Sequence, residues 1–210
     1  MYNKVTNLTP IDLEIVALYY SNYKKELHGR EIARILDANH RTILLALKRL
    51  EEKHVLLSRA IGKNKMFHLN LQSMITREYL TSVEISRTIP ILEKHFFLQK
   101  LLQDSALLLQ DTPLLLFGSY AKGLEKKESD IDILIVKDHS PYYKKIEQKL
   151  KDFGKKYRIQ IQLQKATKED LENGLKEKDP LIQEIFENHI ILNNYQYFVG
   201  VLWMYAHERS

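Results

Sequence analysis

The chain has 210 residues, of which 44% are hydrophobic and 28% charged, as in an ordinary globular protein of one or two domains. It contains no cysteine, which excludes disulfides and thiolate metal sites. The N-terminus has no apolar signal region, and the apolar runs fall short of the ~20 residues that a membrane-spanning helix needs. We therefore expect a cytoplasmic protein without membrane contact.

The net charge of +5 is unevenly distributed along the chain. Residues 1–75 hold twelve basic and seven acidic residues, so they carry the whole excess, and the other 135 residues are neutral. Such asymmetry suggests a polyanionic partner for the first third. A basic solvated surface would give the same count, so charge alone does not decide between the two.

Three helices are expected near the N-terminus. Apolar residues recur at helical spacing in residues 11–20, in the short segment 29–36 and in residues 40–53. Asn39 stands immediately before the third segment, and asparagine is one of the residue types that cap helices. The pattern predicts three helices, with Asn39 as the N-cap of the third.

A β-hairpin is expected next. Two short apolar segments, residues 55–61 and 66–70, flank the turn Gly62-Lys63-Asn64-Lys65. Three helices followed by a hairpin with a basic tip resemble the winged helix-turn-helix family over about residues 10–70. Winged helices bind DNA in many proteins and other proteins in some, so both roles stay open at this point.

The winged-helix resemblance implies a docking geometry on double-stranded DNA. Residues 40–53 would form the recognition helix, with its first turns in a major groove. The side chains near base edges would be Asn39, His40, Arg41 and Thr42. Phosphate contacts, which make binding salt-dependent, would come from Lys48, Arg59, Lys63 and Lys65.

Residues 71–110 read as a helical linker. Their apolar residues follow helical spacing, and Pro90 divides them, because proline breaks or kinks a helix interior. We expect two helices with a bend near Pro90. They would either mediate dimerisation or signalling, or simply pack as a linker, and a homodimer is left open.

Polar residues stand at the ends of two expected strands. The apolar run of residues 112–117 ends at Gly118-Ser119, and residues 130–136 form a second run that opens with Asp130-Ile131-Asp132. Side chains alternate along a strand, so Asp130 and Asp132 share one face. Two adjacent carboxylates repel each other, and a hard cation such as Mg²⁺ removes that conflict. Gly118 lets backbone approach a ligand, and a helix beginning at Ser119 would offer amides and a hydroxyl to phosphate.

This pattern resembles a known signature. Gly118-Ser119, a gap of ten residues and Asp130-Ile131-Asp132 are similar to the motif of minimal members of the DNA polymerase beta nucleotidyltransferase superfamily. The resemblance covers about residues 111–192 and implies a mixed sheet backed by helices. The expected helices are residues 141–155, 167–175 and 180–188, and the further strands are residues 158–164 and 189–192.

The chain is therefore expected to be a multi-domain α+β protein. Residues 1–70 would form the winged helix-turn-helix domain, residues 71–110 the helical linker and residues 111–210 the nucleotidyltransferase domain. By the resemblance, Gly118 and Ser119 hold a nucleoside triphosphate, while Asp130 and Asp132 are catalytic and bind Mg²⁺. The reaction implied is transfer of a nucleoside monophosphate with release of pyrophosphate.

One feature departs from the family pattern. Active members usually carry a third carboxylate on the later strand, but that strand here offers Gln160, Gln162 and Gln164 on its polar face. A glutamine carbonyl can bind a cation but brings no negative charge. This puts turnover in doubt without removing nucleotide binding.

Three functions stay open. The first is a Mg²⁺-dependent nucleotidyltransferase with a DNA-binding head. The second is a transcription regulator that senses nucleotide through a catalytically degraded site. The third is an antitoxin-type partner of another protein, which could also be the acceptor of the transferred nucleotide.

Overall fold

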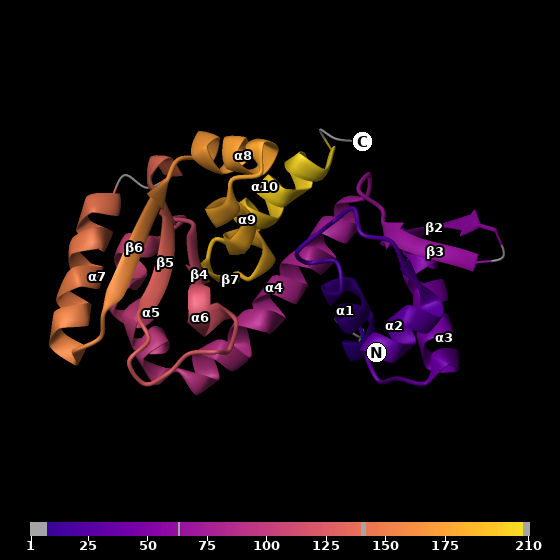
Figure 1. Cartoon of the computed structure of the whole chain (residues 1–210), viewed down its shortest axis with the longest axis horizontal. Coiled ribbons are helices and arrows are strands. Elements are labelled where there is room, and N and C mark those ends of the chain that lie inside the picture. The colour runs from indigo at the N-terminus through magenta and orange to yellow at the C-terminus, as the bar shows by residue number, and fades with distance from the viewer. Residues whose placement is uncertain (1–7, 63, 140–141, 208–210) are drawn as a thin grey trace, which may run out of the picture. The chain divides into compact units, whose positions relative to one another are not determined.

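The computed structural model describes residues 8–62, 64–139 and 142–207 (Figure 1). The chain forms two compact units. Unit 1 contains the residues up to Val83 together with those from Ala206 onward, and unit 2 contains Glu84–Tyr205. The long helix α4 (Met74–Lys94) includes the boundary between them.

Three short helices make up the helical part of unit 1: α1 (Pro10–Ala17), α2 (Gly29–Ile35) and α3 (His40–Glu52). They occupy the three segments in which helices were expected. Helix α1 ends earlier than residue 20, since the chain passes into turns after Ala17. Asn39 caps α3 as predicted, because its Oδ1 accepts a hydrogen bond of 2.8 Å from the backbone N–H of Arg41.

A three-stranded antiparallel sheet completes unit 1. Its order is β1 (Leu27–His28), β3 (Asn64–Leu69) and β2 (Leu56–Ile61). The predicted hairpin is present, with Ile61 opposite Asn64 and Leu56 opposite Leu69. Strand β1 was not predicted, because only two residues of a largely polar segment pair with β3.

The core of unit 1 contains apolar side chains from all three helices and all three strands. The Tyr19 hydroxyl donates a hydrogen bond of 2.9 Å to the carbonyl of Phe67, which ties the segment after α1 to the sheet. Burial raises the pKa of Tyr19, and the nearby Glu31 and Glu26 raise it further. Fully buried members of this core include Ile15, Ile32, Ile43, Leu47, Leu50 and Leu56.

Unit 2 is built on a four-stranded sheet in the order β6 (Ile161–Ala166), β5 (Ile131–Val136), β4 (Leu114–Phe117) and β7 (Ile190–Asn193). Strands β5 and β6 are parallel, whereas β4 is antiparallel to both β5 and β7. The expectation of a mixed sheet backed by helices is therefore confirmed for this part of the chain.

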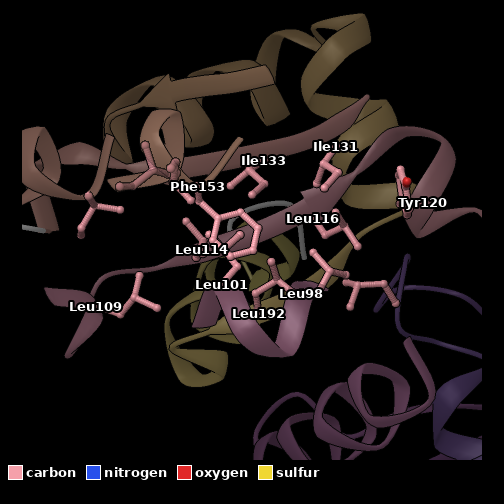
Figure 2. Packing of buried hydrophobic residues seen from close by; sticks show 14 residues of the cluster. Leu98, Leu101, Leu109, Leu114, Leu116, Tyr120, Ile131, Ile133, Phe153 and Leu192 are labelled. Atoms are coloured by element: carbon pink, nitrogen blue, oxygen red, sulfur yellow. The ribbon is translucent and has the colours of Figure 1, made fainter. Parts of the chain in front are cut away.

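One face of this sheet is covered by helices α5 (Phe96–Leu109) and α7 (Tyr143–Tyr157). Figure 2 shows the apolar cluster between them, where Leu101 of α5 and Phe153 of α7 meet Leu114 and Ile133 of the sheet. The alternate residues of β5 enter this cluster, so the remaining side chains of the strand face the opposite side. That opposite side carries the candidate site.

Helices α8 (Lys168–Glu177), α9 (Pro180–Glu187) and α10 (Tyr195–His207) follow the sheet strands β6 and β7 in the chain. Thr167 and Asp170 form a capping box at the start of α8. Strand β6 begins later than expected, because α7 continues to Tyr157 and ends at Arg158, whose φ of 55° turns the chain. The other predicted elements of this region are present within a few residues.

The linker segment differs from the expectation in one respect. Two helices are present, but α4 passes through Pro90, and the break lies at His95 before α5. Pro90 and its neighbour Ile89 are exposed, so the proline ring faces solvent rather than packed neighbours. A proline costs least at such a position. Over the described part of the chain, no helix is both long and apolar enough to span a membrane.

A buried polar network fixes the end of α9. Glu84 and His189 are each 1% exposed, and the Glu84 carboxylate pairs with Arg87 at 2.6 Å and with His189 at 3.3 Å. Burial raises the pKa of Glu84, but His189 and Arg87 outweigh it, and the net pKa is lowered. Because the His189 Nδ1 also contacts the carbonyl of Phe186 at 2.8 Å, the network holds the C-terminal end of α9 to this part of α4.

Candidate functional site

The two aspartates stand where β5 begins, on the face away from the apolar cluster. Ile131, Ile133 and Ile135 are fully buried, whereas Asp130 and Asp132 are half-buried. The alternation expected from the sequence is therefore seen. Two carboxylates separated by one residue point to the same side of the sheet.

Gly118 lies directly against Asp132. Strand β4 pairs with β5 so that Phe117 is opposite Asp132, and the chain turns immediately afterwards with a Gly118 φ of 68°. A Cβ placed on Gly118 would lie only 2.1 Å from Oδ2 of Asp132. The Gly-Ser turn and the carboxylate pair therefore lie together, although they are more than ten residues apart in the sequence.

The helix at the Gly-Ser turn is too short to bind an anion in the way expected from the sequence. Helix α6 (Gly118–Ala121) is a single turn. A helix of this length adds little dipole, so the expectation of anion binding at a helix N-terminus is weakened. What remains for phosphate at this turn is close backbone approach at Gly118 and the half-buried Ser119.

Aromatic packing holds this turn in place. Tyr120 is 7% exposed and makes edge-on contacts with the rings of His95 and Phe97, with centroids 5.1 and 5.7 Å apart. Figure 2 shows Tyr120 at the edge of the apolar cluster. Burial raises the pKa of Tyr120, and Glu125 and Asp130 raise it further. The side chain next to Ser119 thus anchors the Gly-Ser turn to the start of α5.

Gln162 takes the position where a third carboxylate was sought. It lies opposite Asp132 in the parallel pairing of β5 and β6, and its Nε2 donates a hydrogen bond of 2.7 Å to Oδ2 of Asp130. Among the described residues, no group of three or more His, Cys, Asp or Glu side chains is placed to hold a metal ion. The departure noticed in the sequence is therefore also present in the structure.

Sequence reasoning missed one acidic residue near the site. The pKa of Asp132 is raised mainly by burial and further by Asp130 and by Glu184. Glu184 lies on α9. The carboxylate of Glu184 pairs with the ammonium of Lys122 at 2.6 Å. Lys122 is the residue that directly follows α6. No local motif marks Glu184, because it is separated from Lys122 by 62 residues.

This set of donors fits one hard cation. Asp130 and Asp132 are oxygen ligands of the kind that Mg²⁺ prefers, with water completing the coordination, and Gln162 would add its amide oxygen only after turning the amide whose Nε2 is now bound to Asp130. The set does not fit a pair of metal ions, because only two carboxylates stand on the strands. The two carboxylates are therefore compatible with a single cation, and the Asp132 carboxylate fills the space next to the Gly118 Cα.

The residues expected to contact DNA lie in unit 1. His40, Arg41 and Thr42 are exposed on the first turn of α3, next to the capping residue Asn39. The proposed phosphate contacts are largely paired with carboxylates instead: Lys48 with Glu52 at 3.8 Å, Arg59 with Glu26 at 2.7 Å and Lys65 with Glu51 at 2.9 Å. Lys63 lies outside the described residues.

A groove in unit 1 contains basic residues that the sequence reasoning did not select. It has a volume of about 440 Å³. Arg30 and His28 line it with His40, Lys65 and Asn64. The His28 Nδ1 accepts a hydrogen bond of 3.1 Å from the N–H of Arg30, which caps the start of α2.

Replacing Gly118 by alanine should destabilise the protein more than the same change at Gly123. Both glycines have a φ near 67°, but a Cβ at Gly123 meets nothing within 4 Å. Gly123→Ala should therefore cost only the backbone strain, about 1–2 kcal/mol. Gly118→Ala should cost roughly 1–3 kcal/mol more, because it must displace Asp132. Equal losses in urea unfolding would contradict the close contact.

Replacing Asp132 by asparagine should stabilise the ligand-free protein. The pKa of Asp132 lies above its ordinary value of 3.8, so its charged form is disfavoured in the folded state. The wild type should lose stability relative to Asp132→Asn as the pH rises from 3.8 through the raised pKa. Thermal unfolding across this range measures the difference. Asp111→Asn, at an exposed position, is the control. A lower melting temperature for Asp132→Asn at neutral pH would argue for a structural role.

Comparison with known proteins bears on the C-terminal part of the chain. No curated protein and no solved structure matched the sequence. A family model did match, and it covers all four strands of the unit 2 sheet and both sides of the Gly118–Asp132 contact. Residues 97–193 are similar to the nucleotidyltransferase domain family, which confirms the nucleotidyltransferase part of the resemblance.

Proposed function

We propose that unit 2 binds a nucleoside triphosphate with Mg²⁺ and transfers the nucleoside monophosphate to an acceptor. The observation that carries this proposal is the contact between Gly118 and Asp132, with Asp130 on the same face. It lies within the stretch similar to nucleotidyltransferase domains. Two neighbouring carboxylates repel each other, so their presence beside Gly118 does not stabilise the fold.

Each residue has a role in this proposal. Gly118 and Ser119 hold the phosphate tail, while Asp130 and Asp132 hold the cation. When bound, Mg²⁺ supplies positive charge that stabilises the attacking and leaving oxygens. The reaction joins an acceptor oxygen to the α-phosphorus and releases pyrophosphate.

Lys122 is the nearest candidate for a further phosphate contact on this turn. It follows α6 directly, and its backbone N–H donates to the carbonyl of Gly118 at 3.2 Å. In the ligand-free protein its ammonium is paired with Glu184, and both side chains are partly exposed. A pair of this kind is worth only about 0–1 kcal/mol, so a polyphosphate can replace the carboxylate.

A second function is favoured by Gln162. Since β6 carries no carboxylate, no base on that strand can accept the proton of the acceptor hydroxyl, and Asp130 is already hydrogen-bonded to an amide. Binding without turnover is the expected behaviour of such a site. The protein would then be a regulator that senses nucleotide, or an antitoxin-type partner of another protein.

For unit 1 we propose binding to double-stranded DNA. Three helices and an antiparallel sheet in the order β1–β3–β2 support the interpretation of unit 1 as a winged helix, in which α3 would be the recognition helix and β2–β3 the wing. The exposed first turn of α3 presents Asn39, His40, Arg41 and Thr42. Lys48, Arg59, Lys63 and Lys65 would contact phosphate, three of them after exchanging a carboxylate partner.

The nucleotide proposal is tested by calorimetry with ATP, GTP, CTP and UTP, each with and without Mg²⁺. At least one should bind in a cation-dependent way, and Asp130→Asn with Asp132→Asn should weaken that binding by tenfold or more, about 1.4 kcal/mol.

Glu184→Gln should tighten binding, because it releases Lys122 and removes a negative charge near the phosphates. Lys122→Gln should weaken it, whereas Lys126→Gln should not.

Transfer is measured in the same protein with labelled nucleotide and protein, RNA or small-molecule acceptors. Labelled product that disappears in the double asparagine variant supports the enzyme. Cation-dependent binding with no product on any acceptor supports the sensing role instead. Absence of binding for all four nucleotides would contradict both.

The DNA proposal is tested by fluorescence anisotropy with duplex DNA. Binding should weaken by orders of magnitude between about 50 and 200 mM salt, because phosphate contacts release counterions. Arg41→Ala should cost about 1–3 kcal/mol, as expected for a residue at base edges. Arg34→Ala, which makes the same charge change on α2, is the control and should have a smaller effect. Binding that is indifferent to salt, or equal losses in the two variants, would refute this docking.

A further inference from the structure

A basic groove lies beside α7, outside both sites described above. It has a volume of about 410 Å³ and opens to solvent. Its lining comes from three places: the start of α7, strand β6 and the segment directly after β5. The lining residues are Lys137, Tyr143, Lys144, Glu147, Gln148, Lys151 and Lys165.

Positive charge is concentrated here although residues 76–210 are neutral as a whole. Helix α7 carries six lysines and two acidic residues. Four lysines line the groove, against the single carboxylate of Glu147. A segment that is neutral as a whole but carries six lysines on one helix has a local field that its net charge does not reveal.

Glu147 organises the lysines rather than cancelling them. Its Oε1 pairs with Lys151 at 2.9 Å and its Oε2 with Lys165 at 2.9 Å. These two ion pairs lower the pKa of Glu147. One half-buried carboxylate thus holds an ammonium from α7 and an ammonium from β6 at the same groove. Among the described residues Lys144 and Lys137 form no ion pair, although Lys137 is near enough to Asp170 to help lower the pKa of that carboxyl.

The groove is separate from the nucleotide site. Lys137 follows the last residue of β5, whereas Asp132 lies near its first residue. Five residues of extended strand separate them, about 16 Å. An anion in the groove would therefore not occupy the Gly118–Asp132 site.

We propose that this groove binds the phosphate backbone of single-stranded nucleic acid. Its lining is rich in charge, which does not suit a small apolar ligand. Lys144 and Lys151 are two helical turns apart, about 10 Å, so they can contact successive phosphates of an extended strand. Tyr143 also lines the groove; because its ring is partly buried against the apolar cluster, only its exposed part is available to a base.

A simpler explanation covers only part of the pattern. Strand β6 is an edge strand, and lysine on an edge strand prevents pairing with another chain. That explains Lys165. It does not explain why Lys137 and Lys144, from two other segments, are gathered at the same groove.

The test is fluorescence anisotropy of the full-length protein with a labelled single-stranded oligonucleotide of about 12 nucleotides, within the site sizes of known single-strand binders. Every protein carries Arg41→Ala, so that unit 1 contributes less. The groove variant is Lys137→Gln with Lys144→Gln and Lys165→Gln. The control is Lys126→Gln with Lys127→Gln and Lys178→Gln, which removes the same charge from exposed positions of unit 2 outside α7 and β6.

The groove variant should bind at least tenfold more weakly than its parent, and the control less than threefold. Three lost phosphate contacts should also reduce the slope of log affinity against log salt by about 2. Matching thermal unfolding curves establish that both variants are folded. Equal losses in the two variants, absence of oligonucleotide binding by the parent, or equally strong binding of labelled polyglutamate would overturn the proposal.

Discussion

The close approach of Gly118 to Asp132 is the constraint on which the candidate site depends. The register that places Phe117 opposite Asp132 leaves room for no side chain at the next residue. Glycine also permits the positive φ that turns the chain at once into α6. Packing of Tyr120 then fixes the direction of that turn. Strand pairing, backbone conformation and aromatic packing therefore converge on one place, the start of β5.

The charges at the start of β5 are compatible both with nucleotide transfer and with nucleotide binding without turnover. Burial raises the pKa of Asp132, and the nearby carboxylates of Asp130 and Glu184 raise it further. Such repulsion is tolerated because the other face of β5 is anchored in an apolar cluster. Gln162 satisfies Asp130 without adding charge, so the site favours a single cation but lacks a carboxylate suited to a second metal or to the acceptor's proton.

Ion pairing also changes how the charge of unit 1 is understood. A count of basic residues treats every lysine and arginine as available to a polyanion. In the structure Arg59 and Lys65 are held by Glu26 and Glu51, whereas Arg41 on the first turn of α3 is exposed beside a groove that includes Arg30. In unit 2 the reverse holds, since Glu147 gathers lysines of a neutral segment at one groove. The local arrangement of charges therefore matters more than their sum.

The sequence alone determined the features that depend on short-range periodicity: the helices of unit 1, the hairpin, the four strands of unit 2 and the shared face of Asp130 and Asp132. It correctly predicted two helices in the linker but placed their division at Pro90, whereas α4 continues through the proline and the division lies at His95. Only the tertiary structure decided that Gly118 touches Asp132, that Gln162 binds Asp130 and that Glu184 pairs with Lys122. These contacts join residues far apart in the chain. They arise from strand register and helix packing, which no local pattern encodes.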